Sequence, residues 1–245
     1  MKTAILSDVH SNLEALERCC AHACAQGAER FVCLGDMVGY GADPCATLDL
    51  LMSLPGIVAL RGNHDEALFR DPGDHAPEAV RRVLAWTRAQ LSEAQLKFLQ
   101  DLPYVWREEG VTYAHASADQ PMRWEYVRMP EQAERCLAAA GTPLVFIGHV
   151  HEPKIYYETA GGALRDFTPA RSEVIPLSAR SRYVVNVGSV GQPRDGDAAS
   201  SYVLYDAARA EVVFHRLAYD YHATGRKIRA VGLSAYYADR LARGR

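Results

Sequence analysis

The sequence predicts an α/β fold in which parallel strands are joined by helical crossovers. Strand-like and helix-like segments alternate through the first half of the chain, as is typical of such folds. Apolar runs of strand length, each ended by polar residues, lie at residues 3–7, 31–34, 57–60, 111–114 and 144–147. Because open α/β sheets bind ligands beyond the carboxyl ends of their strands, we expect one functional site at the ends of these five runs.

Each of those runs leads into side chains that commonly bind metals. The motifs are Asp8-Val9-His10, Gly35-Asp36, Gly62-Asn63-His64-Asp65, His115 and Gly148-His149-Val150-His151. Together they offer the oxygen and nitrogen ligands that a pair of divalent cations needs. Imidazole, carboxylate and amide ligands without a thiolate suit Mn, Fe, Zn, Co or Ni. The expected cofactor is therefore two divalent metal ions of these kinds.

Three residues of the motifs have distinct expected roles. Two cations need a shared ligand, and Asp36 has two carboxylate oxygens next to Gly35, which lets the backbone come close. Asn63 offers a neutral carbonyl oxygen, whereas its neighbour His64 points elsewhere and is free to give a proton to a leaving group. Asp65 or another carboxylate would orient His64; the alternative is that His64 is itself a metal ligand.

Capping signals place helices between and after these strands. Ser11-Asn12-Leu13-Glu14 fits a capping box that opens a helix toward Gly27, and Asp43-Pro44 opens another that runs to about Ser53. Residues 77–100 are helical with a second start at Ser92. Residues 130–141 form a further helix, bounded by a proline and a glycine.

The second half of the chain adds antiparallel pairing. Residues 154–158 and 163–167 flank a glycine pair and predict a hairpin, and further strands are predicted at residues 183–187, 202–205 and 211–217. Because no linker or repeat divides it, the 245-residue chain is expected to be a single domain, 1–245. Its expected additions are a helical cover at about 72–103, on the sheet or at the rim of the site, and a C-terminal helix at about 222–242.

Composition excludes several classes of function. The formal net charge of -3 gives no electrostatic footprint for long nucleic acid or an anionic membrane. No apolar run approaches the roughly 20 residues of a membrane span, and no secretory leader is evident, so a cytoplasmic location is expected. The six cysteines are expected to be reduced and mostly buried.

The ordered motifs Asp-x-His, Gly-Asp, Gly-Asn-His-Asp, a lone His and Gly-His-x-His resemble those of the calcineurin-like metallophosphoesterases, over roughly residues 3–195. The resemblance implies a four-layer αββα double β-sandwich. It implies a first metal bound by Asp8, His10, Asp36 and His151, and a second bound by Asp36, Asn63, His115 and His149. It also implies that His64 is the catalytic histidine.

One loop departs from the protein Ser/Thr phosphatases of this superfamily, which carry Gly-Asp-x-x-Asp-Arg-Gly. Residues 35–41 read Gly-Asp-Met-Val-Gly-Tyr-Gly, without the second carboxylate and the arginine. This stretch, with residues 186–194, resembles the small bacterial and archaeal phosphoesterases instead. Arg194 is a candidate substrate-phosphate contact or a surface arginine in a turn. A pocket for a nucleotide base is expected to be lined by Arg123, Trp124 and Tyr126; the alternative is that these residues serve only in packing.

The expected reaction is hydrolysis of small phosphate esters by a metal-bridging hydroxide, with phosphodiesters or nucleotide-like substrates favoured. Asn63 and Arg194 are expected to contact the substrate. The alternatives are a phosphomonoesterase or protein phosphatase, a non-catalytic metal-binding scaffold for protein partners, and a DNA nuclease, which the acidic balance disfavours. The sequence leaves open the physiological substrate, the native metal pair and the oligomeric state.

Overall fold

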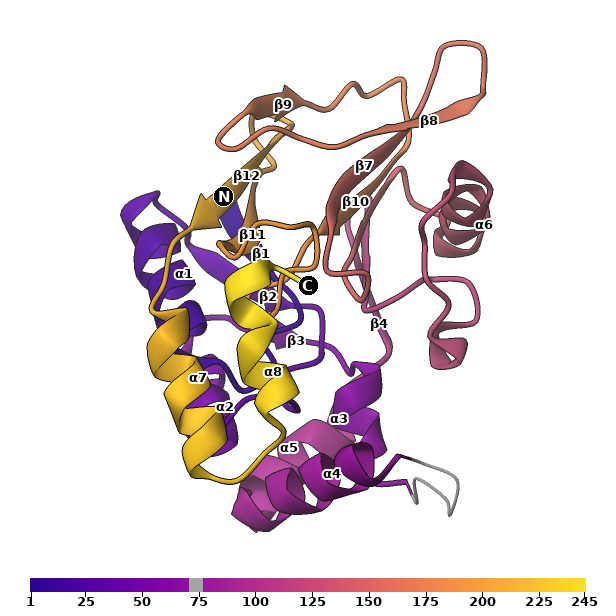
Figure 1. Cartoon of the computed structure of the whole chain (residues 1–245). Helices are drawn as coiled ribbons and strands as arrows, with labels where there is room; N and C mark the ends of the chain where they lie inside the picture. The colour runs from indigo at the N-terminus through magenta and orange to yellow at the C-terminus, as the bar shows by residue number, and fades with distance from the viewer. Residues whose placement is uncertain (71–76) are drawn as a thin grey trace.

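Two packed six-stranded sheets form the centre of the molecule, with helices on both outer faces (Figure 1). The computed structural model describes residues 1–70 and 77–245. The first sheet has the strand order β3 (Val58–Ala59), β2 (Arg30–Cys33), β1 (Lys2–Leu6), β11 (Ser200–Asp206), β12 (Glu211–Leu217), β9 (Val174–Pro176). The second has the order β4 (Val105–Glu108), β5 (Val111–Ala114), β6 (Leu144–Ile147), β10 (Tyr183–Val187), β7 (Pro153–Glu158), β8 (Leu164–Phe167). This arrangement confirms the predicted fold class.

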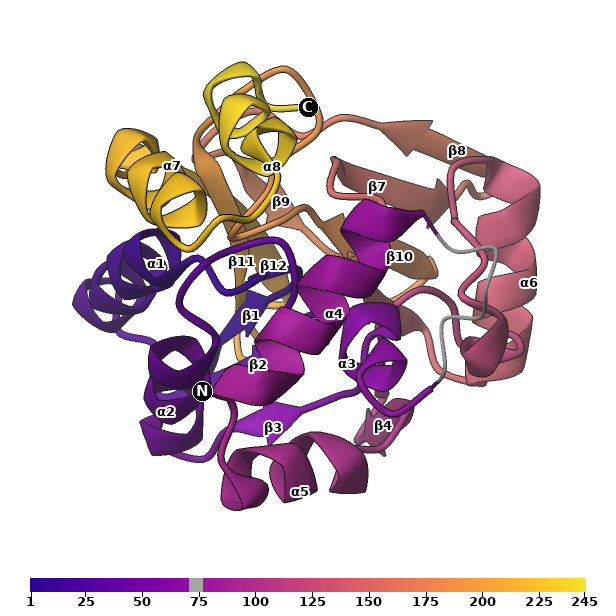
Figure 2. The ribbon, with the colours of Figure 1, turned by 60° about the horizontal axis from the view of Figure 1, so that its bottom comes forward.

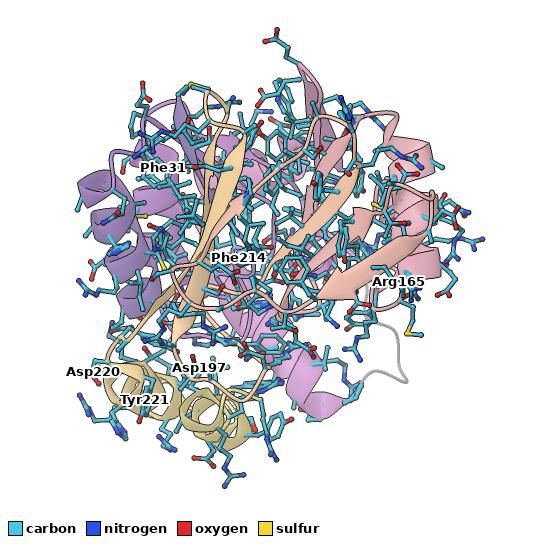
Figure 3. The ribbon with its side chains drawn as sticks, turned by 90° about the horizontal axis from the view of Figure 1, so that it is seen from above. Phe31, Arg165, Asp197, Phe214, Asp220 and Tyr221 are labelled. Atoms are coloured by element: carbon cyan, nitrogen blue, oxygen red, sulfur yellow. The ribbon has the colours of Figure 1, made fainter. Side chains whose placement is uncertain are left out.

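Strand periodicity explains the layers, since successive side chains of a strand point to opposite faces. In β1, Leu6 packs toward the helices while Ile5 packs into the core between the two sheets. The buried strands are apolar on both faces for this reason. Figure 3 shows the same division, with Phe214 between the sheets and Phe31 on the helical side of the first sheet.

Parallel pairing dominates where the sequence predicted crossovers. Strands β1, β2 and β3 are mutually parallel in the first sheet, and β5, β6 and β10 are parallel in the second. Helices α1 (Leu13–Ala25) and α2 (Pro44–Ser53) cover the outer face of the first sheet, and α6 (Pro130–Ala140) covers the second. The carboxyl ends of these parallel strands therefore meet at one end of the molecule.

The start of α1 differs from the predicted capping box. Asn12, not Ser11, caps the helix, and its Oδ1 accepts a hydrogen bond from the Ala15 N–H at 3.2 Å. Ser11 has a left-handed backbone, with φ of 53°, and its N–H donates to the carbonyl of Met37. Ser11 thus belongs to the loop of the site, which explains the shift by one residue.

Helix α3 (Asn63–Ala67) starts at the third ligand motif. Helices α4 (Glu78–Gln90) and α5 (Glu93–Asp101) occupy most of the region predicted as a cover, of which residues 72–76 lie outside the described residues. The predicted capping box at Ser92 is confirmed by its hydrogen bond from the Gln95 N–H. Helix α4 runs across the end of the molecule beside the C-terminal helices (Figure 2), and Val83 of α4 packs against Tyr237 there. It therefore lies at the rim of the predicted site.

The C-terminal segment is two helices rather than the one predicted at about 222–242. Helix α7 (Tyr221–Ala230) is followed by α8 (Ala235–Asp239) and a 3-10 turn, η2 (Leu241–Arg243). Gly232, with φ of +73°, reverses the chain between them. Edge strands β4 and β9 were also not predicted. Among the helices in the described ranges, none has the length and apolar character needed to cross a membrane.

Candidate metal centre

All the predicted ligands lie where the loops after β1, β2, β3, β5 and β6 converge. Asp8, Asp36 and Asn63 follow strands of the first sheet, and His115, His149 and His151 follow strands of the second. The backbone joins these loops directly, since the Asp8 N–H donates to the carbonyl of Gly35 and the Gly148 N–H to that of His115. The site is therefore built from both sheets at their shared edge.

The backbone is strained at the ligand positions. Non-glycine residues with positive φ include Asp8, His10, Asp36, His149 and His151, with φ between 52° and 66°. A left-handed conformation costs such residues on the order of 1 kcal/mol or more each, and it persists where the surrounding structure enforces it. The clustering of this strain in the converging loops indicates that they are shaped for function.

Four ligands form a first buried group, namely Asp8, His10, Asp36 and His151. Their ligating atoms all lie within 4.8 Å of one another. His151 Nε2 is 3.1 Å from Asp8 Oδ1 and 3.3 Å from His10 Nε2. All four side chains are almost fully inaccessible to solvent.

A second group shares Asp36 and adds His115 and His149. Asp36 Oδ2 lies 3.7 Å from His10 Nε2 of the first group and 3.4 Å from His115 Nε2 of the second. Asn63 adjoins this second group, with its Oδ1 3.2 Å from His115 Nε2. The carboxylate of Asp36 therefore lies between the two groups, at the position predicted for the shared ligand.

The hydrogen bond that His151 makes leaves two acceptor atoms, one of His151 and one of Asp8, facing each other. His151 Nδ1 lies 2.6 Å from the Gln192 carbonyl oxygen, so it carries the ring proton and donates, which leaves Nε2 as a bare acceptor. That bare nitrogen faces Asp8 Oδ1, which accepts no hydrogen bond within the described part of the chain. Two buried acceptors at such a distance repel each other unless a cation lies between them.

The electrostatics of the second group likewise favour a positive charge. Burial lowers the pKa of His115, but the carboxylates of Asp36 and Asp8 outweigh it and raise that pKa to about 9. For Asp8, burial acts to raise the pKa, yet His151 and His115 hold it below its ordinary value. The centre thus attracts cations, and its nitrogen and oxygen donors fit divalent metals.

Asp65 is not the carboxylate that orients His64, and the alternative of another carboxylate stays a prediction. The buried Asp65 carboxylate accepts hydrogen bonds from the backbone N–H groups of Asp36, Met37 and Gly62, at 2.8, 3.0 and 3.0 Å. Asp65 therefore holds the loops of Asp36 and Asn63 together. The His64 N–H donates to Asp36 Oδ1 at 2.8 Å, and its ring lies beside the centre with a pKa lowered chiefly by burial.

Trp124 and Tyr126, expected to line a pocket or to serve in packing, both contact the second group. The Trp124 carbonyl oxygen lies 3.0 Å from His149 Nε2, which places the ring proton there and leaves Nδ1 facing the centre. Tyr126 stacks on His149 with ring centroids 4.2 Å apart. Arg123 is exposed in the turn η1 (Pro121–Arg123), and no contact brings it to the ligands within the described ranges.

Sequence reasoning missed Tyr40. Its ring lies 4.7 Å from that of His10 and 4.4 Å from that of His64, so it contacts a ligand and the expected catalytic histidine together. The signal was its place between Gly39 and Gly41 in the loop of Asp36. Glycines on both sides permit a close approach of this loop, since a Cβ at Gly41 would lie 2.3 Å from the His10 carbonyl oxygen.

Comparisons with known proteins agree with this arrangement. The sequence model of the calcineurin-like phosphoesterase superfamily domain matches residues 1–210. An uncharacterised protein of Methanocaldococcus jannaschii is 32% identical over 247 residues, covering 99% of this chain and 98% of the relative.

Solved structures share the fold over the whole chain. The crystal structure of a metallophosphoesterase from Sphaerobacter thermophilus has 35% sequence identity and a TM-score of 0.88, covering 100% of both chains. A hypothetical protein from Pyrococcus horikoshii shares the fold with a TM-score of 0.79 at 17% identity, covering 100% of this chain and 98% of its own. Together with the buried cluster of candidate metal-binding side chains, these matches show that the chain belongs to the calcineurin-like phosphoesterase superfamily and is a hydrolase of phosphoric ester bonds.

Proposed function

We propose that this protein is a binuclear phosphoesterase of small substrates, with phosphodiesters and nucleotide-like compounds favoured over phosphoproteins. The observation that carries the proposal is the position of Asp36, whose Oδ2 faces His10 on one side and His115 on the other. A carboxylate oxygen so placed is suited to be shared by two cations.

The donor set divides between two ions as the family resemblance implies. Asp8, His10, Asp36 and His151 would hold the first ion, and Asp36, Asn63, His115 and His149 the second. When bound, such cations supply Lewis-acid charge for the phosphoryl oxygens and an acidified water as nucleophile. Mn, Fe, Zn, Co and Ni all suit these nitrogen and oxygen donors.

His64 is the proposed proton donor to the leaving group. Its backbone N–H is anchored on Asp36, and its ring lies against those of Tyr40 and His10. No hydrogen bond occupies the imidazole nitrogens among the residues that the structure describes. The ring is thus held beside the centre with its nitrogens available for a proton transfer, a role worth about 10²- to 10⁴-fold in rate for a well-placed group.

Two features favour small substrates. A Cβ at Gly39 would lie 2.8 Å from His64 Nδ1, so this position has no room for the charged side chains that phosphoprotein phosphatases carry in the corresponding loop. The backbone N–H of Arg194 donates to the His151 carbonyl oxygen at 3.1 Å, which places Arg194 next to the first group. We assign Arg194 and Asn63 to contacts with the substrate phosphate.

The test is hydrolysis of bis-p-nitrophenyl phosphate and p-nitrophenyl phosphate by metal-stripped protein resupplied with each of the five metals. His64→Ala should lower kcat by at least about 10²-fold while two ions remain bound per chain. Asp36→Ala should lower both the metal content and the activity. Exposed His222 and Asp101 provide matched controls, and His222→Ala and Asp101→Ala should leave both quantities unchanged.

The substrate ratio and the metal content decide the outcome. A higher kcat/KM for the diester than for the monoester supports the proposed substrate class. Turnover by His64→Ala at the rate of the parent protein would remove His64 from the reaction. Two bound ions without turnover of either ester, for every metal, would overturn a general phosphoesterase.

A further inference from the structure

We infer that Arg194 and Arg240 form a subsite for a second phosphoryl group of the substrate, next to His64. This inference rests on the proposed function, and it assigns part of the site to α8 and η2, which lie beyond the family match at residues 1–210. The preferred substrates are then phosphate esters that carry another phosphate on the leaving-group side.

Tyr40 connects the metal ligands with the C-terminal helices. Its ring contacts His10 and His64 on one side and lies 5.0 Å from the ring of Tyr237 in α8. Tyr237 is buried and packs in one cluster with Ile228, Val83 and Leu241. The C-terminal helices therefore form a wall of the site on the side of His64.

The loop that bears Arg194 is fixed to the same wall. The Gly196 N–H donates to the Gly244 carbonyl oxygen at 2.9 Å, just after η2. Gly244 has φ of +58°, and a Cβ there would lie 2.7 Å from the backbone of Asp197, so the two segments are in direct contact. Figure 3 places Asp197 beside the C-terminal helices. Arg194 and Arg240 consequently approach the site from two segments that are packed together.

The charges of the two guanidinium groups act on Tyr40 and on each other. Burial raises the pKa of the Tyr40 hydroxyl, and the charges of Arg194 and Arg240 oppose that rise. Burial also lowers the pKa of Arg240, and the charge of Arg194 lowers it further. Both arginines are only partly exposed. Their like charges therefore repel in a partly desolvated place.

No aspartate or glutamate in residues 1–70 and 77–245 forms a salt bridge with either arginine, although most other partly buried cations of the protein have one. Arg194 Nη2 donates to Gln192 Oε1 at 2.8 Å, and its buried Nε has no partner in the described ranges. Arg240 stacks over Tyr236 at 5.2 Å, and its Nε donates to the Arg245 carbonyl oxygen. Two guanidinium groups without an aspartate or glutamate partner in the described ranges suit an anion, and phosphate fits their planar donors.

The position next to His64 assigns this anion to the leaving-group side. The scissile phosphate belongs over the metal ligands, whereas Arg240 directly follows α8, whose Tyr237 packs against Tyr40. A phosphoryl group held there adds binding energy only for substrates that carry it. Arg240 is thus a specificity-determining residue.

The test compares two inhibitors of bis-p-nitrophenyl phosphate hydrolysis, methylphosphonate with one phosphoryl group and methylenediphosphonate with two, with metal kept in excess. The parent protein should bind methylenediphosphonate at least tenfold more tightly than methylphosphonate. Arg240→Gln should remove most of this preference, and Arg240→Lys should restore part of it. Arg243→Gln, an exposed arginine of η2, is the matched control and should keep the preference.

The subsite would be overturned if Arg240→Gln weakened the binding of both inhibitors equally, or if the parent protein bound the two inhibitors with equal affinity. Failure of the proposed function is a separate outcome, in which the parent protein does not hydrolyse the diester at all. In that case calorimetric titration of the metal-loaded protein still measures the affinity for each of the two inhibitors. The same results then support or contradict the subsite.

Discussion

Glu66 accepts a hydrogen bond from the indole Nε1–H of Trp124, with a distance of 2.9 Å between the two atoms. The carboxylate is buried and also accepts from the Tyr104 hydroxyl at 2.9 Å. Because the Trp124 carbonyl receives the Nε2–H of His149, this bond fixes the loop that orients a metal ligand. The position of His149 thus depends on a carboxylate that does not itself face the centre.

Removing that indole donor should therefore weaken metal binding. Trp124→Phe keeps an aromatic ring but leaves Glu66 short of a partner, and outer contacts of this kind are typically worth about 10- to 100-fold in metal affinity. We expect the Kd of the more weakly held ion to rise about tenfold, measured by calorimetric titration of metal-stripped protein. Trp106→Phe removes a similar indole bond, to Glu108, at an exposed site and should leave the Kd unchanged. Equal Kd values in both variants would contradict the role of Trp124.

Asp65→Asn should destabilise the protein even without metal. The amide keeps one acceptor oxygen and turns an NH₂ group toward backbone N–H groups that the carboxylate now accepts. Burial raises the pKa of Asp65 to about 7, so urea titrations at pH 8 measure the ionised form. Because hydrogen bonds to a charged group are worth about 1.5–3 kcal/mol each, the free energy of unfolding should fall by at least about 3 kcal/mol there. Asp101→Asn, at an exposed Lys97 pair, should change it by less than about 1 kcal/mol. A small effect of Asp65→Asn would show that the loops hold without it.

Gly148→Ala should displace Asp8. A Cβ at Gly148 would lie 1.9 Å from Ser7 Oγ and 2.6 Å from Asp8 Oδ2, closer than atoms can approach. Overpacking of this kind typically costs about 1–3 kcal/mol, and we expect that loss together with fewer bound ions by elemental analysis. Gly161→Ala is the matched control, since a Cβ there meets only Thr159 Oγ1 at 4.0 Å. Full metal content in Gly148→Ala would mean that the loop yields without moving the ligand.

His215 should make stability fall in mild acid. Burial and the charge of His22 lower the pKa of His215 to about 4, against about 6.5 in an unfolded chain. Between these values the unfolded chain binds more protons than the folded one, so the free energy of unfolding decreases as pH falls from about 6.5 toward 4 and is unaffected above that range.

The loss attributable to His215 should reach on the order of 2 kcal/mol by pH 5. Urea unfolding of metal-stripped protein at pH 7 and pH 5 measures it, and His215→Gln should be less sensitive to acid than the parent by that amount. His222→Gln, at an exposed position, should behave as the parent does. The same acid sensitivity in His215→Gln and the parent would assign the effect to other groups.

The strands and the ligand positions could be predicted because both depend on local pattern. Continuous apolar runs identified β1 and β2, and a ligand, Asp8 or Asp36, follows within a few residues of the end of each of these strands. The prediction failed where one segment imposes a conformation on another. Ser11 does not cap α1, because its N–H donates to the carbonyl oxygen of Met37 in a neighbouring loop.

Contacts between distant segments were also beyond sequence reasoning. Asp65 was assigned to His64, its neighbour in sequence, but its acceptor oxygens face N–H groups some thirty positions earlier. Tyr40 and Tyr237 meet only because α8 folds back over the loop of Asp36, and the break at Gly232 that allows this return was not recognised. Residues that shape the substrate side of the site therefore depend on the tertiary fold.

The division of the ligands between the two sheets makes a bound ion a cross-link. An ion held by Asp36 of the first sheet and His115 of the second can be bound fully only when the sheets are docked. Ligands that bind only the folded state stabilise it by mass action, so each tenfold rise in free metal above the Kd adds about 1.4 kcal/mol to the free energy of unfolding. Metal supply in the surroundings would then regulate how long the folded chain survives as well as how fast it turns over substrate.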